Sequence, residues 1–113
     1  MSVVVDLATL HVQIERFGSR ALLVTTGTDG PPHVASVLVT VAGDKLEMGG
    51  GRKTRANASE RPAVVLVWIA RDENEHCLIV DGTGGEGSAG EFIVTPTSAV
   101  LHRLAGAPDE VSG

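Results

Sequence analysis

The sequence predicts a mainly β fold in which six short antiparallel strands form a small barrel, with an N-terminal helix packed on it or beside it. The apolar segments are short, rich in β-branched residues and separated by Gly, Pro or charged residues, which is typical of strands. Most connections are too short for the helical crossovers of a parallel sheet. The chain has 113 residues, 42% of them hydrophobic, so we expect a single domain over residues 1–113.

A helix is expected over residues 6–17, where apolar residues recur at helical spacing. The apolar positions are Leu7, Leu10, Ile14 and Phe17. Asp6 can cap the start of this helix, and Gly18 can end it. One amphipathic helix therefore precedes the strands.

Six strand-like segments are expected to build the barrel over residues 21–103. They are residues 21–26, 33–41, 45–48, 63–69, 75–81 and 91–102. Short turns with Gly, Asp or Pro, at residues 27–32 and 42–44, favour antiparallel hairpins and a meander. Residues 82–90 are expected to form a flexible loop, and residues 104–113 a flexible tail.

The most unusual segment is basic and follows the three consecutive glycines of residues 49–51. Four basic residues and one acid lie between Arg52 and Arg61, in a chain whose formal net charge is −5. Residues 52–60 contain good helix formers, so we expect a short helix between the third and fourth strands, ended by Pro62.

The start of this short helix is a candidate anion site. Glycines let the backbone approach a ligand, and the first N–H groups of a helix are unpaired and carry positive dipole character. Arg52 and Lys53 add two positive charges, which favour a phosphomonoester. The alternative is a solvated basic helix face that pairs with Glu60 and neighbouring acids. The residues alone leave both interpretations open.

Other motifs carry less weight. Residues 82–87 match G-x-G-x-x-G, but β-branched residues and Pro96 follow where a helix would have to begin, so a dinucleotide site is not indicated. Arg52 separates the glycines from Lys53, which disfavours a triphosphate-binding loop. The histidines lie far apart and no His–carboxylate–Ser set can be assembled, so we assign no catalytic residues and no metal ligands.

The composition of the chain limits the classes of molecule that it is expected to bind. The chain has 14 acidic against 9 basic residues and only 3% aromatic residues, which argues against nucleic acid. Its apolar runs fall well short of the roughly 20 residues of a membrane-spanning helix. It begins without the basic stretch of a secretory signal, and Cys77 is its only cysteine. We therefore expect a cytoplasmic protein with a small-molecule ligand.

Four short motifs follow one another along residues 21–103. They are DGPPH at residues 29–33, RKTRAN at residues 52–57, RPAV at residues 61–64 and TSAVLHR at residues 97–103. Their order and spacing resemble those of the split-barrel flavin-binding proteins related to pyridoxamine 5′-phosphate oxidase, including the deazaflavin-using relatives.

The resemblance implies a six-stranded antiparallel split β-barrel that forms a homodimer with a flavin-type cofactor in each cleft between subunits. The cofactor would be FMN or a deazaflavin coenzyme. The reaction would be hydride transfer with a small-molecule substrate, in which the cofactor supplies the chemistry and the protein supplies position and electrostatics. No catalytic side chain is required by such a scheme.

The resemblance also implies which residues bind the cofactor. The second strand would line the isoalloxazine ring with the backbone of Ser36, Val37, Leu38 and Val39. The end of the third strand would border the ring and the ribityl chain with Met48, Gly49 and Gly50. Arg52 and Lys53 would hold the phosphate, and Asn57 would orient the short helix.

The chain also departs from the full oxidases. It lacks their C-terminal substrate-binding extension and contains no Tyr, so a small reductase is expected rather than a pyridoxamine-phosphate oxidase. Glycines occupy residues 49–51, where relatives carry a turn with Ser or Thr. A non-catalytic alternative stays open, in which a dimeric split barrel binds haem, another planar or anionic ligand, or no cofactor.

Overall fold

The structure is a computed structural model that describes residues 2–71, 75–103 and 105. In chain order its elements are β1 (Ser2–Val4), the 3-10 turn η1 (Leu7–Thr9), α1 (Leu10–Phe17), β2 (Arg20–Thr25), β3 (His33–Leu38), β4 (Thr40–Ala42), β5 (Lys45–Met48), α2 (Arg52–Glu60), β6 (Ala63–Trp68), β7 (His76–Glu86) and β8 (Phe92–Arg103). The expected tail, residues 104–113, lies outside the described residues apart from Ala105.

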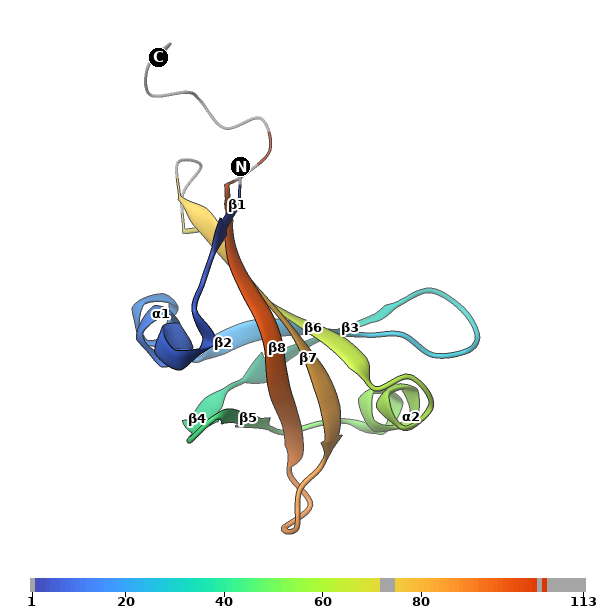
Figure 1. The fold of residues 1–113 in the computed structure, drawn as a ribbon. Coiled ribbons are helices and arrows are strands. Elements are labelled where there is room, and N and C mark those ends of the chain that lie inside the picture. Colours follow the sequence, from blue (N-terminus) through green and yellow to red (C-terminus); the bar gives the residue numbers. More distant parts are fainter. Residues whose placement is uncertain (1, 72–74, 104, 106–113) are drawn as a thin grey trace.

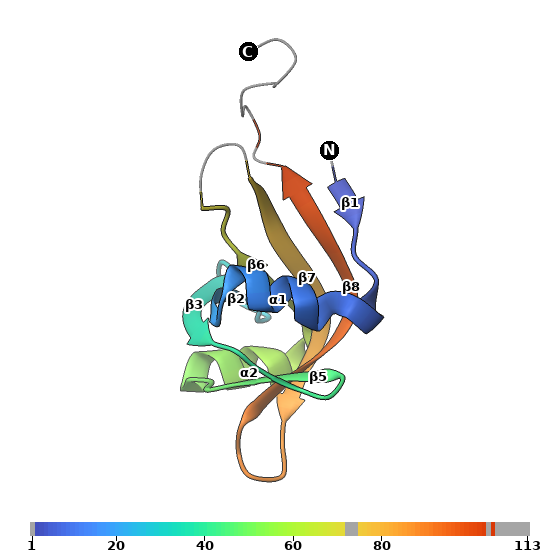
Figure 2. The ribbon, with the colours of Figure 1, turned by 90° about the vertical axis from the view of Figure 1, so that its left-hand side faces the viewer.

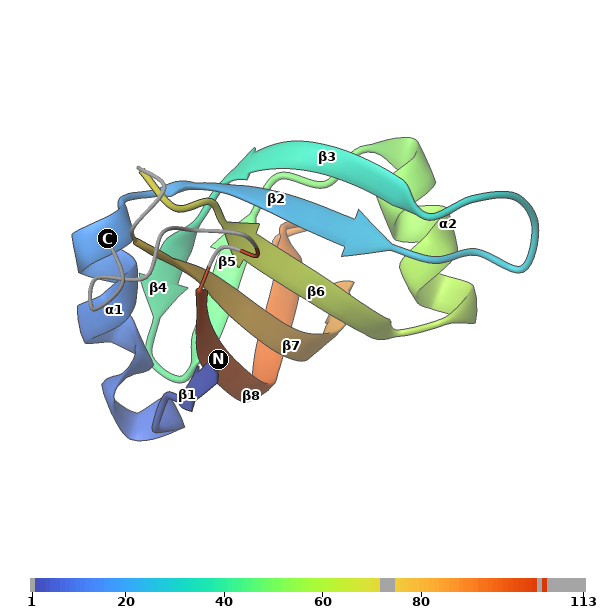
Figure 3. The same cartoon turned by 90° about the horizontal axis from the view of Figure 1, so that it is seen from above.

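The strands form one curled antiparallel sheet in the order β3-β2-β6-β7-β8-β5-β4, with β1 added along β8 (Figure 1). The two ends of this order, β3 and β4, are consecutive in the chain and separated only by Val39. Because the chain passes directly from one end of the sheet to the other, the sheet has to curl into a half-barrel, as the view from above shows (Figure 3). The predicted mainly β barrel fold is confirmed.

The strand count and the connectivity differ from the sequence prediction. The described residues form eight strands, because the short β1 was not predicted and the expected strand at residues 33–41 divides at Val39 into β3 and β4. The Val39 N–H donates to the carbonyl of Ser19 at 2.7 Å, which marks the point where β3 leaves its partner β2. The meander was wrong as well: after β5 the chain crosses through α2, so that β6 pairs with β2 and β5 with β8.

Part of the expected loop at residues 82–90 is strand. Residues 82–86 belong to β7 and pair with β8, with Gly82 opposite Pro96 and Glu86 opposite Phe92. Gly82 and Gly84 allow this pairing because atoms of β8 occupy the space that a Cβ would need there. A Cβ on Gly82 would lie 2.6 Å from Val94, and one on Gly84 would lie 2.6 Å from the tip of the Phe92 ring.

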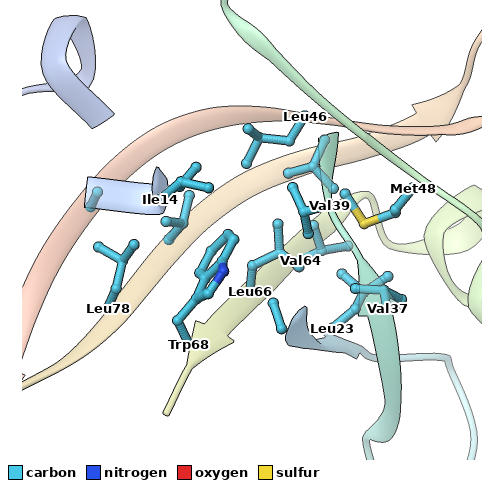
Figure 4. Packing of buried hydrophobic residues seen from close by; sticks show 14 of the residues in the cluster. Ile14, Leu23, Val37, Val39, Leu46, Met48, Val64, Leu66, Trp68 and Leu78 are labelled. Atoms are coloured by element: carbon cyan, nitrogen blue, oxygen red, sulfur yellow. The ribbon is translucent and has the colours of Figure 1, made fainter. Parts of the chain in front are cut away.

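The core fills the inside of the curled sheet (Figure 4). Inward side chains of β2, β6 and β7, such as Leu23, Leu66 and Leu78, are fully buried. Trp68 is buried too, and its Nε1–H donates to the Gly18 carbonyl at 2.9 Å, directly after α1. The sequence prediction for α1 is confirmed in outline, with η1 as its first turn; the helix lies across the sheet and contributes its buried side chains to the core (Figure 2).

The outer face of the sheet carries an apolar band. The half-buried side chains of Leu22, Val67 and Ile79 lie opposite one another across β2, β6 and β7. Exposed apolar residues extend the band at its margins, including Leu38 (64% exposed) and Ile69 (62% exposed). Among the described residues, no helix is long and apolar enough to cross a membrane.

Candidate functional site

Helix α2 begins without a side-chain cap. Its N-cap residue is Gly51, whose backbone is extended (φ −77°, ψ 179°) and whose carbonyl accepts the Arg55 N–H at 3.1 Å. A glycine cap offers no side-chain acceptor for the first N–H groups of the helix, those of residues 52–54. These donors remain available at a place where the helix dipole favours negative charge.

Two positively charged side chains lie at the start of α2. Arg52 and Lys53 are exposed, and in the described part of the chain neither has a hydrogen-bond or ion-pair partner. Glu60, the acid expected to neutralise the basic segment, instead accepts a hydrogen bond from Thr28 Oγ1 at 2.7 Å. Among the described residues the expected pairing with Glu60 is not formed, and the anion site stays a prediction.

Asn57 anchors α2 to the barrel. Its side chain is only 2% exposed, and Nδ2 donates to Thr25 Oγ1 of β2 at 3.1 Å. A Cβ at Gly27 would lie 2.5 Å from Asn57 Oδ1, so only a glycine there leaves room for this contact. Asn57 is thus placed to orient the helix, and its buried amide faces the protein.

The three glycines before α2 have different surroundings. Gly50 packs against Phe92, because a Cβ on Gly50 would lie 3.0 Å from Phe92 Cβ. Cβ atoms on Gly49 and Gly51 would meet nothing within 4 Å. Only Gly49 and Gly51 therefore present open backbone, whereas Gly50 is a packing residue.

The second-strand residues divide between two faces of β3. The side chains of Val37 and Val39 point into the core with Met48, as Figure 4 shows, so they cannot line a ligand site. The side chains of Ser36 and Leu38 are exposed.

Strand β3 pairs only with β2 in the described sheet. The Val39 N–H points toward β2, and neighbouring strand residues point their N–H and C=O groups in opposite directions. The polar backbone groups of Ser36 and Leu38 therefore point to the free edge of β3.

The structure places α2 against β2, β3 and β7, so the helix start, the glycine turn and β3 belong to one region of the barrel (Figures 1 and 3). Two hollows, of about 430 and 480 Å³, lie instead beside α1, on the other side of the barrel, and none of the predicted cofactor residues lines them. Among the described residues no group of three or more His, Cys, Asp or Glu could hold a metal ion.

Sequence reasoning missed the residues that support this region. Thr25 binds Asn57, Arg55 binds the carbonyl of Gly50, and Phe92 packs on Gly50. Their partners lie five to more than thirty residues away, so no local pattern reveals them. The basic segment contains Arg55, but its composition cannot distinguish this partly buried side chain from the exposed cations beside it.

No known protein-family profile matches the chain. Over 89 residues it is 38% identical to uncharacterized proteins of Mycobacterium bovis and Mycobacterium tuberculosis, a match that covers 74% of this chain. The matched region makes up 55% of these relatives, so the chain spans about half their length.

Several solved structures share the fold. HupZ of Group A Streptococcus has a TM-score of 0.67 at 14% identity and covers 87% of this chain and 97% of its own. A pyridoxamine 5′-phosphate oxidase-like protein from Listeria innocua has a TM-score of 0.65 at 14% identity, covering 85% of this chain and 98% of its own.

The FAD binding protein from Mycobacterium smegmatis has a TM-score of 0.61 at 17% identity, covering 91% of this chain and 100% of its own. An F420 reductase matches with a TM-score of 0.50 at 20% identity, over 76% of this chain and 86% of its own. The chain thus has the split-barrel fold of the pyridoxamine 5′-phosphate oxidase-like proteins.

Proposed function

We propose that this chain binds a flavin-type cofactor, FMN or a deazaflavin, through a phosphate held at the start of α2, and that it serves as an oxidoreductase for a small molecule. The observation that carries the proposal is the uncapped start of α2 beside two unpaired cations, Arg52 and Lys53. The fold neighbours that bind FAD or are F420 reductases support a cofactor of this class.

The residues at the helix start fit a phosphate. Open backbone at Gly51 lets the group approach the first N–H donors of α2, and Arg52 and Lys53 can close over it. A charge-assisted hydrogen bond contributes on the order of 1.5–3 kcal/mol, so two such contacts suffice for a phosphate that carries roughly two negative charges. Arg52 and Lys53 are thus the residues that would hold the group.

The free edge of β3 fits the planar ring. Outward backbone donors and acceptors at Ser36 and Leu38 can pair with the polar edge of a flavin, while Val37 and Val39 keep the strand fixed in the core. When bound, the cofactor supplies the hydride chemistry, and the chain orients it. This division of labour agrees with the lack of an assigned catalytic side chain.

We further propose that the protein is a homodimer and that a second copy covers the outer apolar band. Within one chain, the start of α2 and the edge of β3 lie open to solvent, so a ligand there would lack a second wall. A broad apolar face on a small domain usually marks an interface. Ile69→Glu should convert dimers to monomers in sedimentation analysis, whereas Val12→Glu, the same kind of change at an exposed apolar residue of α1, should not.

The test of cofactor binding is a titration of the purified protein with FMN and with the deazaflavin F420, followed by flavin fluorescence. Lys53→Ala should weaken binding by about 1.5–3 kcal/mol because a charged phosphate contact is lost. Arg61→Ala is the matched control: it removes one charge at the other end of the nine-residue helix, roughly 13 Å away.

The results separate the alternatives. Binding of either cofactor with the expected loss in Lys53→Ala alone supports the site. Equal losses in both variants would reduce the effect to net charge. Absence of binding at tens of micromolar would reject the proposal, and haem binding in its place would favour the non-catalytic alternative.

A further inference from the structure

Arg55 lies in the basic segment, yet its contacts set it apart from Arg52 and Lys53. Its side chain is only 28% exposed. Nε donates to the Gly50 carbonyl at 2.8 Å, one terminal nitrogen donates to Glu86 Oε1 at 3.1 Å, and the other donates to the Gly90 carbonyl at 2.7 Å. One guanidinium thus joins the glycine turn, the end of β7 and the β7–β8 hairpin.

The same turn is held from a second direction. Phe92, the first residue of β8, is buried between Gly50 and Gly84: a Cβ on Gly50 would lie 3.0 Å from Phe92 Cβ, and one on Gly84 would lie 2.6 Å from the tip of the ring. Gly50 is therefore fixed by the Phe92 side chain and by the Arg55 hydrogen bond. Both contacts tie the start of α2 to the β7–β8 hairpin.

We propose that Arg55 is a positioning residue for the anion site, which acts through Gly50 and does not touch the ligand phosphate. This inference rests on the proposed cofactor function. Each guanidinium nitrogen already donates to a protein acceptor, so three of its five N–H groups are used within the chain. Since Gly51 follows Gly50 directly, the Arg55–Gly50 bond sets the direction in which the first N–H groups of α2 point.

The planar fork of arginine is what this role requires. Its donors diverge in fixed directions and reach three acceptors from separate segments at once. A lysine keeps the positive charge but concentrates its donors on one flexible atom, so it cannot hold the Gly50 and Gly90 carbonyls in the same geometry. Charge and geometry can therefore be separated by substitution.

The experiment compares Arg55→Lys, Arg55→Gln and Glu86→Gln by FMN titration and by ¹⁵N relaxation of the Gly49–Gly51 amides without ligand. Arg55→Lys and Arg55→Gln should each raise the Kd about threefold to tenfold, the effect of one lost hydrogen bond of ordinary strength. In both, the order parameter of the Gly50 amide should fall from about 0.85 toward 0.6. Glu86→Gln keeps both carbonyl contacts, so its Kd should stay within about twofold.

Wild-type affinity in Arg55→Lys would overturn the proposal, because charge alone would then suffice. A weaker Kd with an unchanged Gly50 amide would overturn it as well, since Arg55 would then contact the phosphate itself. A lower melting temperature with unchanged Kd would reduce Arg55 to a structural residue. If wild type binds neither FMN nor F420, the proposed function fails, and the relaxation of Gly50 in Arg55→Lys still decides whether Arg55 positions the turn.

Discussion

The helical segment that begins at Leu7 and helix α2 start in different ways. Before η1, the Asp6 carboxylate accepts the Ala8 N–H at 3.0 Å, and the Thr9 hydroxyl donates to the Asp6 carbonyl at 3.1 Å. Before α2, Gly51 offers no side chain, and no acid lies in the first turn. At the first start the Asp6 side chain satisfies one N–H group, whereas at the second start no side chain does.

The missing side-chain cap at α2 costs the fold little stability. Glycine as an N-cap is less favourable than Ser or Asp by only a few tenths of a kcal/mol. The fold compensates elsewhere, because Asn57 and Arg55 fix α2 to β2 and to the β7–β8 hairpin. The helix start can therefore stay unsatisfied while the helix itself is rigidly placed.

The largest expected effect comes from removing both free cations. Arg52→Ala combined with Lys53→Ala should weaken FMN binding by about 3–6 kcal/mol, the sum of two charged contacts. The melting temperature should hardly change, since neither side chain has a partner in the described structure. A large loss of stability would show that these residues support the fold, and the contrast between the two helix starts would fail.

The next effect separates the glycines of the turn. Gly50→Ala should destabilise the protein by about 1–3 kcal/mol, because the new methyl group presses on Phe92, whose ring tip Gly84 already confines. Gly49→Ala is the control, since a Cβ there meets nothing within 4 Å. Urea unfolding measures both, and equal stabilities would show that Phe92 can shift.

Much of the fold could be predicted from the sequence, because strand and helix signals are local. The helical spacing of residues 6–17 and the helix formers of residues 52–60 both gave elements close to those observed. Strand order could not be predicted, since the pairing of β2 with β6 depends on residues some forty positions apart. Gly82 and Gly84 were wrongly assigned to a loop, because their role depends on Val94 and Phe92 of another strand.

For the candidate site, the sequence indicates residues but not their surroundings. Charge and order along the chain single out Arg52, Lys53 and Asn57, and the structure places all three in α2, while their binding role stays a prediction. Arg55 carries the same charge as its neighbours, so only its contacts at residues 86 and 90 reveal a different role. Local composition thus indicates a candidate anion site but cannot identify the residues that support it.

A smaller effect is expected at the satisfied start. Asp6→Ala removes the acceptor of the Ala8 N–H and should lower stability by about 1 kcal/mol. FMN affinity should not change, because α1 and α2 lie on opposite sides of the barrel. Thermal unfolding measures the stability and titration measures the FMN affinity. A loss of affinity in this variant would contradict the contrast between the two helix starts.

The smallest effect tests whether the glycine N-cap is what leaves the first N–H groups of α2 available. Gly51→Ser fits the extended backbone at this position, and a Cβ there meets nothing within 4 Å. The new hydroxyl oxygen can accept one N–H of the first turn, so stability should rise by a few tenths of a kcal/mol. Its O–H remains a donor that can turn toward a phosphate, so FMN affinity should stay within about threefold of wild type.

Gly49→Ser is the matched control for that variant. It adds the same hydroxyl two residues earlier, also with nothing within 4 Å, but outside the N-cap position, so it should change neither stability nor affinity. If Gly51→Ser instead abolished FMN binding, the phosphate would need every first-turn N–H group for itself. The ligand would then take at α2 the kind of first-turn N–H group that the Asp6 side chain takes before η1. The cap residue alone would decide which helix start can bind.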